Sequence, residues 1–457
     1  MNDQIKRPIP VDEAQAFLAA HPDVRFIDAI FIDLCGILRG KRYPRGDLER
    51  IFKDGFPIPY TTYLLDVTGE NMNPCGRGFN DGDPDGIARP VPGTLVPVPW
   101  SDKPAGQVLM TLNDEDGAPS PIDPRNQAAA AVERFKATGL SPVVAFELEF
   151  FLIDRERDGQ GRPQAPISPA TGRRESETQV FGMAQLEAYA AFFEAVEQAS
   201  QVQGVPASVA STEYAPGQFE INLRHVDDPL AAADHCALLR NIVKQVARRQ
   251  GMDATFMSKP FAATTGSGMH LHVSLVESAG ANAFDDGSRA GNETLRHAIG
   301  GLGATLAEAM AIFASNRNAY RRFGANLFVP VSKSWATNNR SVAFRIPAGP
   351  GAGRRVEHRV AGADANPYLV LAAVLAGLQH GLEHRIDPGP MAEGNASAEP
   401  DPDLPLAWEA ALDRLDRAEI LPRYLDGDCL KLYVATKREE LKRFAATISP
   451  QEYDWYL

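Results

Sequence analysis

Cysteine and positive charge are both scarce in this sequence. The 457 residues include four cysteines, which stand far apart at positions 35, 75, 236 and 429. This spacing is not typical of a disulfide framework or a zinc site, so we expect free thiols in a reducing compartment. The formal net charge of −13 argues against a nucleic-acid partner, which needs a basic surface. Small anionic substrates are not excluded, because a local group of arginines can override the global charge.

Long apolar runs and a Walker motif are also missing. The longest apolar stretch, Pro367–Leu378, is far shorter than the roughly 20 residues that cross a bilayer. Residues 1–10 are polar and contain two prolines, unlike a signal peptide. We therefore expect no membrane partner and a cytoplasmic location. Because no GxxxxGK[ST] segment is present, ATP binding of the Walker type is not indicated.

The length and the order of the expected elements predict two domains in an α+β fold. A chain of 457 residues is too long for one ordinary core. Residues 1–115 have strand and turn character and form a small N-terminal domain, whereas 120–457 form a large α+β domain. Within the large domain, helical apolar spacing is found at 126–138, 184–203, 229–250, 293–313 and 366–383. The Pro- and Ala-rich segment 388–405 is expected to be a surface loop.

Two carboxylates share one face of a predicted strand at Phe146–Phe150. This segment alternates apolar and acidic residues, so Glu147 and Glu149 lie on one face and the apolar residues on the other. Adjacent carboxylates beside a core are tolerable if a cation lies between them. The strand alone is equally compatible with a half-buried strand whose acidic face is solvated.

A second pair of carboxylates is expected to meet across a hairpin. Pro and Gly at the centre of Ala215–Gln218 are typical of a type II turn. Pairing residue 215 with 218 would place Glu213 opposite Glu220. Directly opposed like charges destabilise a strand pair, so this register also favours a bound cation.

Two histidines and a serine follow a glycine-rich segment on a third predicted strand. Residues 266–275 alternate so that His270, His272 and Ser274 share one face. Glycine at the start of such a strand permits close approach of a ligand to the backbone. The pattern fits either a structural histidine pair or a ligand-binding face.

A fourth segment, 355–359, places an acidic residue between two arginines. Arg355, Glu357 and Arg359 share one strand face. A surface ladder of ion pairs is one interpretation. The other is a metal ligand flanked by two anion-binding guanidiniums, and further arginines among apolar residues near 321–345 favour it.

These segments together resemble the glutamine synthetase family. The matching blocks, in the family's order, are FELEF at 146–150, EYAPGQFE at 213–220, FMSKPF at 256–261, GSGMHLHVS at 266–274, NAYRRF at 318–323, NNRSVAFRIP at 338–347, RRVEHR at 354–359 and ANPYL at 365–369. Residues 31–44 resemble the family's small β-grasp domain. The resemblance implies an N-terminal β-grasp domain, a glutamine-synthetase-type catalytic α/β domain, and a dodecamer of two hexameric rings with active sites between neighbouring subunits.

The resemblance also implies a role for each matching residue. The metal on the glutamate side would be held by Glu149, Glu213 and Glu220, and the metal on the phosphate side by Glu147, His270 and Glu357. Substrate glutamate would be bound by Arg322 and Arg359 beside Gly266, and the transferring phosphoryl group would be stabilised by Arg340. Nucleotide phosphates would contact Arg345 and Arg355, and the nucleotide pocket would be lined by His272 and Ser274. Carboxylate-rich ligand sets suit Mg²⁺ or Mn²⁺ better than zinc.

The sequence departs from the family where ammonium is bound. By alignment, Pro59 replaces an aspartate and Phe328 replaces a glutamate. An apolar wall suits an organic amine better than NH₄⁺, and the pattern resembles the γ-glutamylpolyamine synthetase branch. We therefore predict ATP- and Mg²⁺-dependent ligation of the glutamate γ-carboxylate to a polyamine or monoamine through γ-glutamyl phosphate. The alternatives are a true glutamine synthetase using ammonia and a non-catalytic assembly that reuses the fold.

Overall fold

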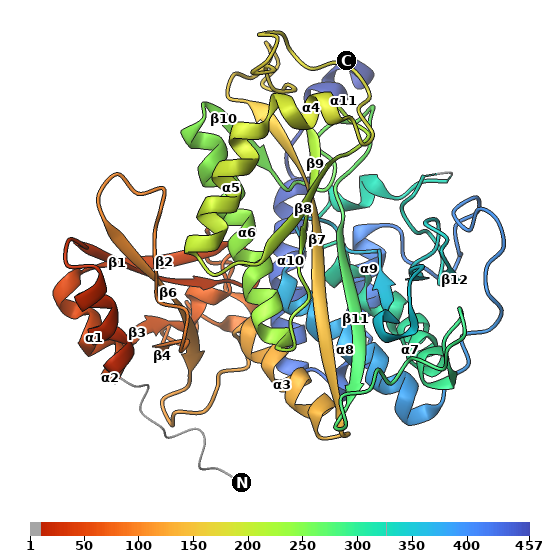
Figure 1. The fold of residues 1–457 in the computed structure, drawn as a ribbon, viewed down its shortest axis with the longest axis horizontal. Coiled ribbons are helices and arrows are strands. Elements are labelled where there is room, and N and C mark those ends of the chain that lie inside the picture. Colours follow the sequence, from red (N-terminus) through yellow and green to blue (C-terminus); the bar gives the residue numbers. More distant parts are fainter. Residues whose placement is uncertain (1–10, 326) are drawn as a thin grey trace.

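A computed structural model describes residues 11–325 and 327–457 of the protein (Figure 1). The polar N-terminal segment 1–10, on which the absence of a signal peptide was predicted, lies outside the described residues. Within the described ranges, no helix is both long enough and apolar enough to span a bilayer.

The N-terminal part of the chain forms a six-stranded sheet on one side of the molecule (Figure 1). Its strands are β1 (Phe26–Ile32), β2 (Leu38–Pro44), β3 (Phe56–Pro59), β4 (Asp85–Pro90), β5 (Val96–Pro97) and β6 (Ala105–Asn113), preceded or joined by helices α1 (Val11–Ala20) and α2 (Leu48–Asp54). The order is β2-β1-β6-β4-β3, β5 pairs with β6, and β1 runs parallel to β6. The predicted smaller N-terminal sheet unit is confirmed, while the division at residues 115–120 stays a prediction.

An eight-stranded sheet carries the rest of the fold. Its strands are β7 (Leu140–Asp154), β8 (Ala207–Thr212), β9 (Gln218–Leu223), β10 (Met252–Thr255), β11 (Met269–Glu277), β12 (Trp335–Thr337), β13 (Phe344–Ile346) and β14 (Val356–His358). Their order is β12-β13-β14-β11-β7-β9-β8, and β10 pairs with the far end of β7. Strand β7 runs through the centre beside β11 (Figure 1) because Phe146, Leu148 and Phe150 on one of its faces are fully buried.

Helices make up most of the remaining chain beside this sheet. They are α3 (Pro124–Lys136), α4 (Met183–Ala188), α5 (Ala190–Val202), α6 (Pro229–Arg249), α7 (Glu293–Phe313), α8 (Pro367–His384), α9 (Trp408–Asp416), α10 (Gly427–Ala445) and α11 (Pro450–Tyr456). Three of them begin at an aspartate or asparagine cap followed by proline, namely at Asp123, Asp228 and Asn366. The α+β class is confirmed, but the single helix expected at 184–203 is wrong, since the chain breaks at Tyr189.

Helices α7 and α8 cross at glycines. A Cβ on Gly301 would lie 2.0 Å from the carbonyl oxygen of Gly377, and one on Gly381 would lie 2.6 Å from the amide of Gly301. The backbones therefore touch at a distance that no larger residue permits. This crossing anchors α8, which begins within the block 365–369.

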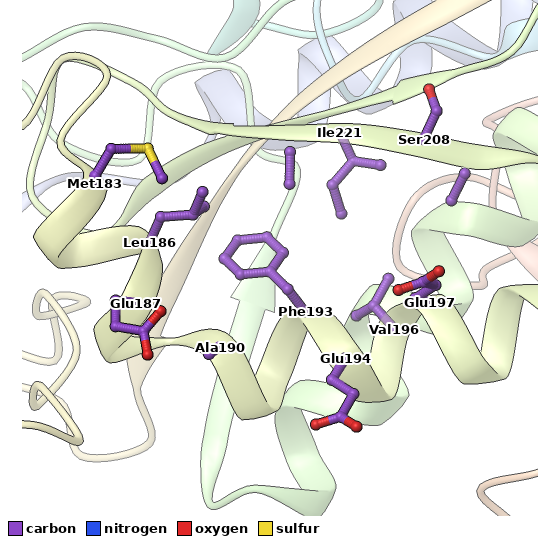
Figure 2. A pocket seen from close by; sticks show the side chains of 12 residues that line it. Met183, Leu186, Glu187, Ala190, Phe193, Glu194, Val196, Glu197, Ser208 and Ile221 are labelled. Atoms are coloured by element: carbon purple, nitrogen blue, oxygen red, sulfur yellow. The ribbon is translucent and has the colours of Figure 1, made fainter.

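A small hollow of about 360 Å³ lies between α4, α5 and the β8–β9 hairpin. Figure 2 shows Phe193 and Ile221 facing each other across it, with Glu187, Glu194 and Glu197 nearer the rim. None of the residues predicted for the active site lines this hollow. The candidate site lies elsewhere, on the other face of β9, to which Glu220 projects.

Candidate active site

The register of three neighbouring strands brings carboxylates and histidines onto one face of the large sheet. On β7, Glu147 lies opposite His270 of β11, and Glu149 lies opposite Glu220 of β9. On the other side of β11, His272 lies opposite Glu357 of β14. Because side chains alternate with period two, all of these groups project from the same face.

The predicted pairing of Glu213 with Glu220 is wrong by two residues. The turn at Ala215–Gln218 forms as expected, with φ of 72° at Gly217 and a 3.0 Å bond from the Gln218 amide to the Ala215 carbonyl. However, the Glu213 amide donates to the carbonyl of Gln218, and Glu220 faces Ser211. The loop of the hairpin is two residues longer than predicted. Because side chains alternate with period two, a register shift of two residues keeps both carboxylates on one face.

His270 lies at the centre of the carboxylates. Its Nδ1 atom is 3.5 Å from Glu147 Oε2 and 3.7 Å from Glu357 Oε1, and its Nε2 atom is 3.9 Å from Glu149 Oε1. One possible ligand atom each from Glu147, Glu220 and His270 lies within 4.8 Å of the others. A second group with the same spacing combines Glu147 with His272 and Glu357.

The electrostatics of this cluster fit a divalent cation. Burial raises the pKa of Glu220 to about 9 and that of Glu213 to about 8, and the negative charges of Glu147 and Glu149 add to both shifts. Burial also opposes ionisation of Glu147, but hydrogen bonds with His270 and His272 outweigh it and lower its pKa. Ionising every carboxylate requires added positive charge, and oxygen-rich donor sets are those that Mg²⁺ or Mn²⁺ prefers.

We expect the stabilising effect of Mg²⁺ to grow with pH. Glu213 and Glu220 have pKa values raised above that of free glutamate, so the metal-free fold binds more protons than the unfolded chain. Stability is therefore lost as pH rises from about 4.5 through about 9. Melting temperatures at pH 6, 7.5 and 9, with chelator or with excess Mg²⁺, should show the largest Mg²⁺ gain at pH 9. Glu220→Gln should flatten this slope, and a Mg²⁺ gain independent of pH would contradict the assignment.

Glu357 is held between the buried Arg359 and the partly buried Arg345. Its Oε2 atom accepts a 2.7 Å bond from Arg345, and its Oε1 atom accepts one from Arg359. Burial would raise the pKa of Glu357, but Arg359, the two histidines and Arg345 more than offset this and hold it at about 2. The Nε–H groups of Arg345, Arg359 and Arg322 are buried and have no partner among the described residues. Such donors suit the oxygen atoms of an anionic substrate.

Arg322 and Gly266 form a buried corner next to the cluster. Arg322 is 3 % exposed and donates to the carbonyl of Val360. A Cβ on Gly266 would lie 2.6 Å from Arg322 Cγ and 2.4 Å from the carbonyl oxygen of Ser258, so only glycine fits beside this side chain. The predicted neighbours Gly266 and Arg322 therefore do lie together.

Three of the four residues predicted for the nucleotide line a cleft of about 1140 Å³, whereas Arg345 is not among its lining residues. His272, Ser274 and Arg355 lie in its wall together with Glu147. Arg355 Nε donates to His272 Nδ1 at 3.0 Å, and His272 Nε2 lies 2.9 Å from Glu147 Oε1. The cleft thus ends directly at the carboxylate cluster, and its volume is slightly above the roughly 300–1,000 Å³ of typical ligand and cofactor pockets.

The remaining predicted residues lie outside the buried cluster. Arg340 is exposed on the loop before β13, and its positive charge partly offsets the upward shift in the pKa of Glu213. Phe328 is 76 % exposed on the loop after Arg322. Pro59 ends β3 in the N-terminal sheet (Figure 1), well away from β7 and β11 of the same chain.

One contact in the site was not predicted. The amide of Gly268 donates to Glu149 Oε2 at 2.8 Å, and the carbonyl of Gly268 accepts the Glu149 amide at 3.0 Å. The glycine-rich segment before β11 was recognised as a place for close approach, but the partner depends on the register between β7 and β11. Sequence patterns do not supply that register.

Known proteins resemble this chain over nearly its full length. The family profile described as "Glutamine synthetase, catalytic domain" matches residues 121–456. The gamma-glutamylputrescine synthetase of Escherichia coli is 38% identical over 97% of this chain and 94% of its own. The glutamate–isopropylamine ligase of a Pseudomonas species is 30% identical over 93% of both chains. A solved GmaS/ADP complex superposes with a TM-score of 0.82 at 28% identity, covering 96% of this chain and 98% of that one.

Proposed function

The chain belongs to the glutamine synthetase family, and from that premise we propose that it is a glutamate–amine ligase. It would use ATP and a divalent cation to join the γ-carboxylate of glutamate to an organic amine. The observation that carries this proposal is the buried set of carboxylates and histidine between the Arg322 corner and the nucleotide-sized cleft. The amine-ligating relatives support the choice of reaction.

The proposed reaction has two displacements. A γ-carboxylate oxygen of glutamate attacks the γ-phosphorus of ATP, the bond to the bridging oxygen breaks, and ADP leaves. The amine nitrogen then attacks the γ-carbonyl carbon of γ-glutamyl phosphate, inorganic phosphate leaves, and the nitrogen loses a proton. Positioning and charge neutralisation dominate such phosphoryl transfer.

The side chains divide this work between them. Arg322 and Arg359 would hold substrate glutamate beside Gly266, and Arg340 would approach the transferring phosphoryl group from its exposed loop. Arg345 and Arg355 would contact nucleotide phosphates, with His272 and Ser274 in the cleft wall. A divalent cation, when bound, polarises phosphoryl oxygens as a Lewis acid. Mg²⁺ or Mn²⁺ would be held by Glu149, Glu213 and Glu220 at one centre, and by Glu147, His270 and Glu357 at the other.

The amine is proposed to be organic because of Phe328 and Pro59. Neither side chain offers the negative charge that ammonium needs, whereas an exposed aromatic ring can lie against the carbon or cationic part of an amine. The far ammonium group of a diamine would need an acidic partner, and Asp66 and Glu70 of the adjacent subunit are the two candidates. Asp66 is buried and already accepts bonds from Thr68 and Arg443, while Glu70 lies 3.3 Å from Arg443 but keeps 62 % of its side chain exposed. Glu70 is therefore the better candidate.

Phosphate release tests the proposal directly. The purified protein is incubated with ATP, Mg²⁺ and glutamate, together with ammonium, putrescine, spermidine, ethanolamine or benzylamine. Release above the amine-free background with at least one organic amine is expected. Release with ammonium alone would favour the glutamine synthetase alternative, and no release with any nucleophile would favour the non-catalytic assembly.

We further propose a dodecamer of two hexameric rings in the cytoplasm. The free cysteines fit a reducing compartment. Strand β3, which ends at Pro59, lies far from β7 and β11 within one chain, so Pro59 can line an amine site only if it reaches the site of a neighbouring subunit. Light scattering coupled to the assay should therefore find ligase activity only in the assembled fraction. A monomer with full activity would contradict shared active sites.

A further inference from the structure

A buried glutamine joins the two halves of the candidate site. Gln218 is the first residue of β9 and is 1 % exposed. It directly follows the turn of the hairpin that carries Glu213 and Glu220. Its side chain bridges the turn of that hairpin and the segment 264–268, in which Gly266 and Gly268 lie against Arg322.

The amide of Gln218 makes three hydrogen bonds that fix its orientation. Its Oε1 atom accepts from the hydroxyl of Thr265 at 2.6 Å and from the amide of Ala215 at 3.2 Å. Its Nε2 atom donates to the carbonyl of Gly266 at 2.9 Å. If the amide were turned over, its NH₂ group would face the N–H donor of Ala215 and its oxygen would face the carbonyl oxygen of Gly266. Neither contact could be a hydrogen bond, so the orientation in the structure is preferred.

These bonds connect groups that have different partners in the proposed reaction. On the hairpin side, the Gln218 backbone carbonyl also accepts the amide of Glu213 at 2.9 Å. On the other side, Gly266 limits the space beside Arg322, and Gly268 donates to Glu149. A displacement of the hairpin is therefore transmitted to the arginine corner through one side chain.

We propose that Gln218 is a positioning residue that couples cation binding at Glu213 and Glu220 to glutamate binding at Arg322. This inference rests on the proposed function, since it uses glutamate as the ligand of the Arg322 corner. A cation that draws the two carboxylates together sets the position of the hairpin. The Gln218 amide then holds the Gly266 carbonyl, and with it the wall of the glutamate site. Binding of either ligand should promote binding of the other, because coupling is reciprocal.

The test compares Gln218→Met with the unmodified protein by calorimetry. Methionine keeps the length and the apolar packing of the side chain but makes none of the three bonds. In the unmodified protein, Mn²⁺ should tighten glutamate binding. In Gln218→Met, glutamate affinity in Mn²⁺ should fall about tenfold, on the scale of a lost buried hydrogen bond, and the gain from Mn²⁺ should disappear. In activity assays of Gln218→Met, the KM for glutamate should rise as its affinity falls, while the KM for ATP stays within about twofold of the value for the unmodified protein.

A matched control separates coupling from loss of stability. Gln127 is also a buried glutamine that joins two elements, donating to the Pro121 carbonyl and accepting the Asp426 amide. Gln127→Met should lower the melting temperature without changing glutamate affinity. If Gln218→Met does not fold, Thr265→Val removes one of the three bonds and should show a smaller effect in the same direction.

Several results would overturn the inference. Mn²⁺ and glutamate binding independently in the unmodified protein would do so, and so would Gln218→Met with normal affinity and normal coupling. Failure of the proposed function is recognised separately, since binding is measured without an amine. A protein that binds glutamate with Mn²⁺ but ligates no amine would refute the ligase and leave the coupling intact.

Discussion

Glu357→Gln should lower kcat/KM for ATP-dependent ligation by roughly 10²–10³-fold, the usual cost of removing one preorganised charge-stabilising group. The carboxylate faces His270 and would provide an anionic oxygen to a bound cation. Glutamine keeps its shape and can still accept a bond from Arg345 or Arg359. Phosphate release with the preferred amine measures the loss, and a circular dichroism melt shows that the fold remains.

Glu357→Ala is expected to be worse for a second reason. Alanine leaves two buried guanidiniums without their shared partner, and breaking a buried pair in this way costs about 3–5 kcal/mol. Glu308 supplies the control, because this buried carboxylate accepts the amides of residues 419–421 and lies outside the cluster. Glu308→Gln should reduce stability while leaving turnover unchanged. Normal turnover by Glu357→Gln would remove Glu357 from the proposed cation site.

Phe328→Glu should shift the enzyme from organic amines toward ammonium. The unmodified protein is expected to prefer its best amine over ammonium by about 10²-fold in kcat/KM, the scale on which apolar pockets discriminate. Alkyl amines have pKa values near ~10.4 and arrive protonated, so either nucleophile must lose a proton. A carboxylate at 328 would supply a partner for ammonium and reduce the ratio about tenfold or more.

The ratio of the two kcat/KM values, measured for both proteins, decides this prediction. Phe444→Glu is a matched control, because Phe444 is a half-exposed phenylalanine on α10 and its replacement should leave the ratio unchanged. If the unmodified protein turns over ammonium as efficiently as every amine tried, Phe328 does not determine the choice of nucleophile.

Local patterns predicted well which carboxylates and histidines share one face of the large sheet. Strict alternation around Glu147 and around His270 was sufficient to place both residues on strands and to assign their faces, because the period of two is a property of the backbone itself. Helices with clear caps, such as the one that begins after Asp228, were located to within a residue or two.

Pairing between distant segments could not be predicted in the same way. The predicted Glu213–Glu220 register was wrong because the loop length of the hairpin is set by the hydrogen bond from the Glu213 amide to the Gln218 carbonyl. The residue types in this segment do not predict that bond. The clamp of Arg345 and Arg359 on Glu357 depends on the neighbouring position of β13 and β14. The break at Tyr189 was missed because the apolar spacing continues across it. The roles of the individual site residues stay predictions until variants are measured.

The candidate cation ligands and the candidate amine contact sit on parts of the fold that respond differently to change over evolution. Glu147, Glu149, Glu220, His270 and Glu357 stand on hydrogen-bonded strands, where an inserted or deleted residue would turn the side chains that follow to the opposite face. Phe328 stands on a loop outside any strand, where changes in length and composition are tolerated. A lineage with this architecture can therefore acquire new nucleophiles by exchanging loop residues while its phosphoryl-transfer centre stays unchanged.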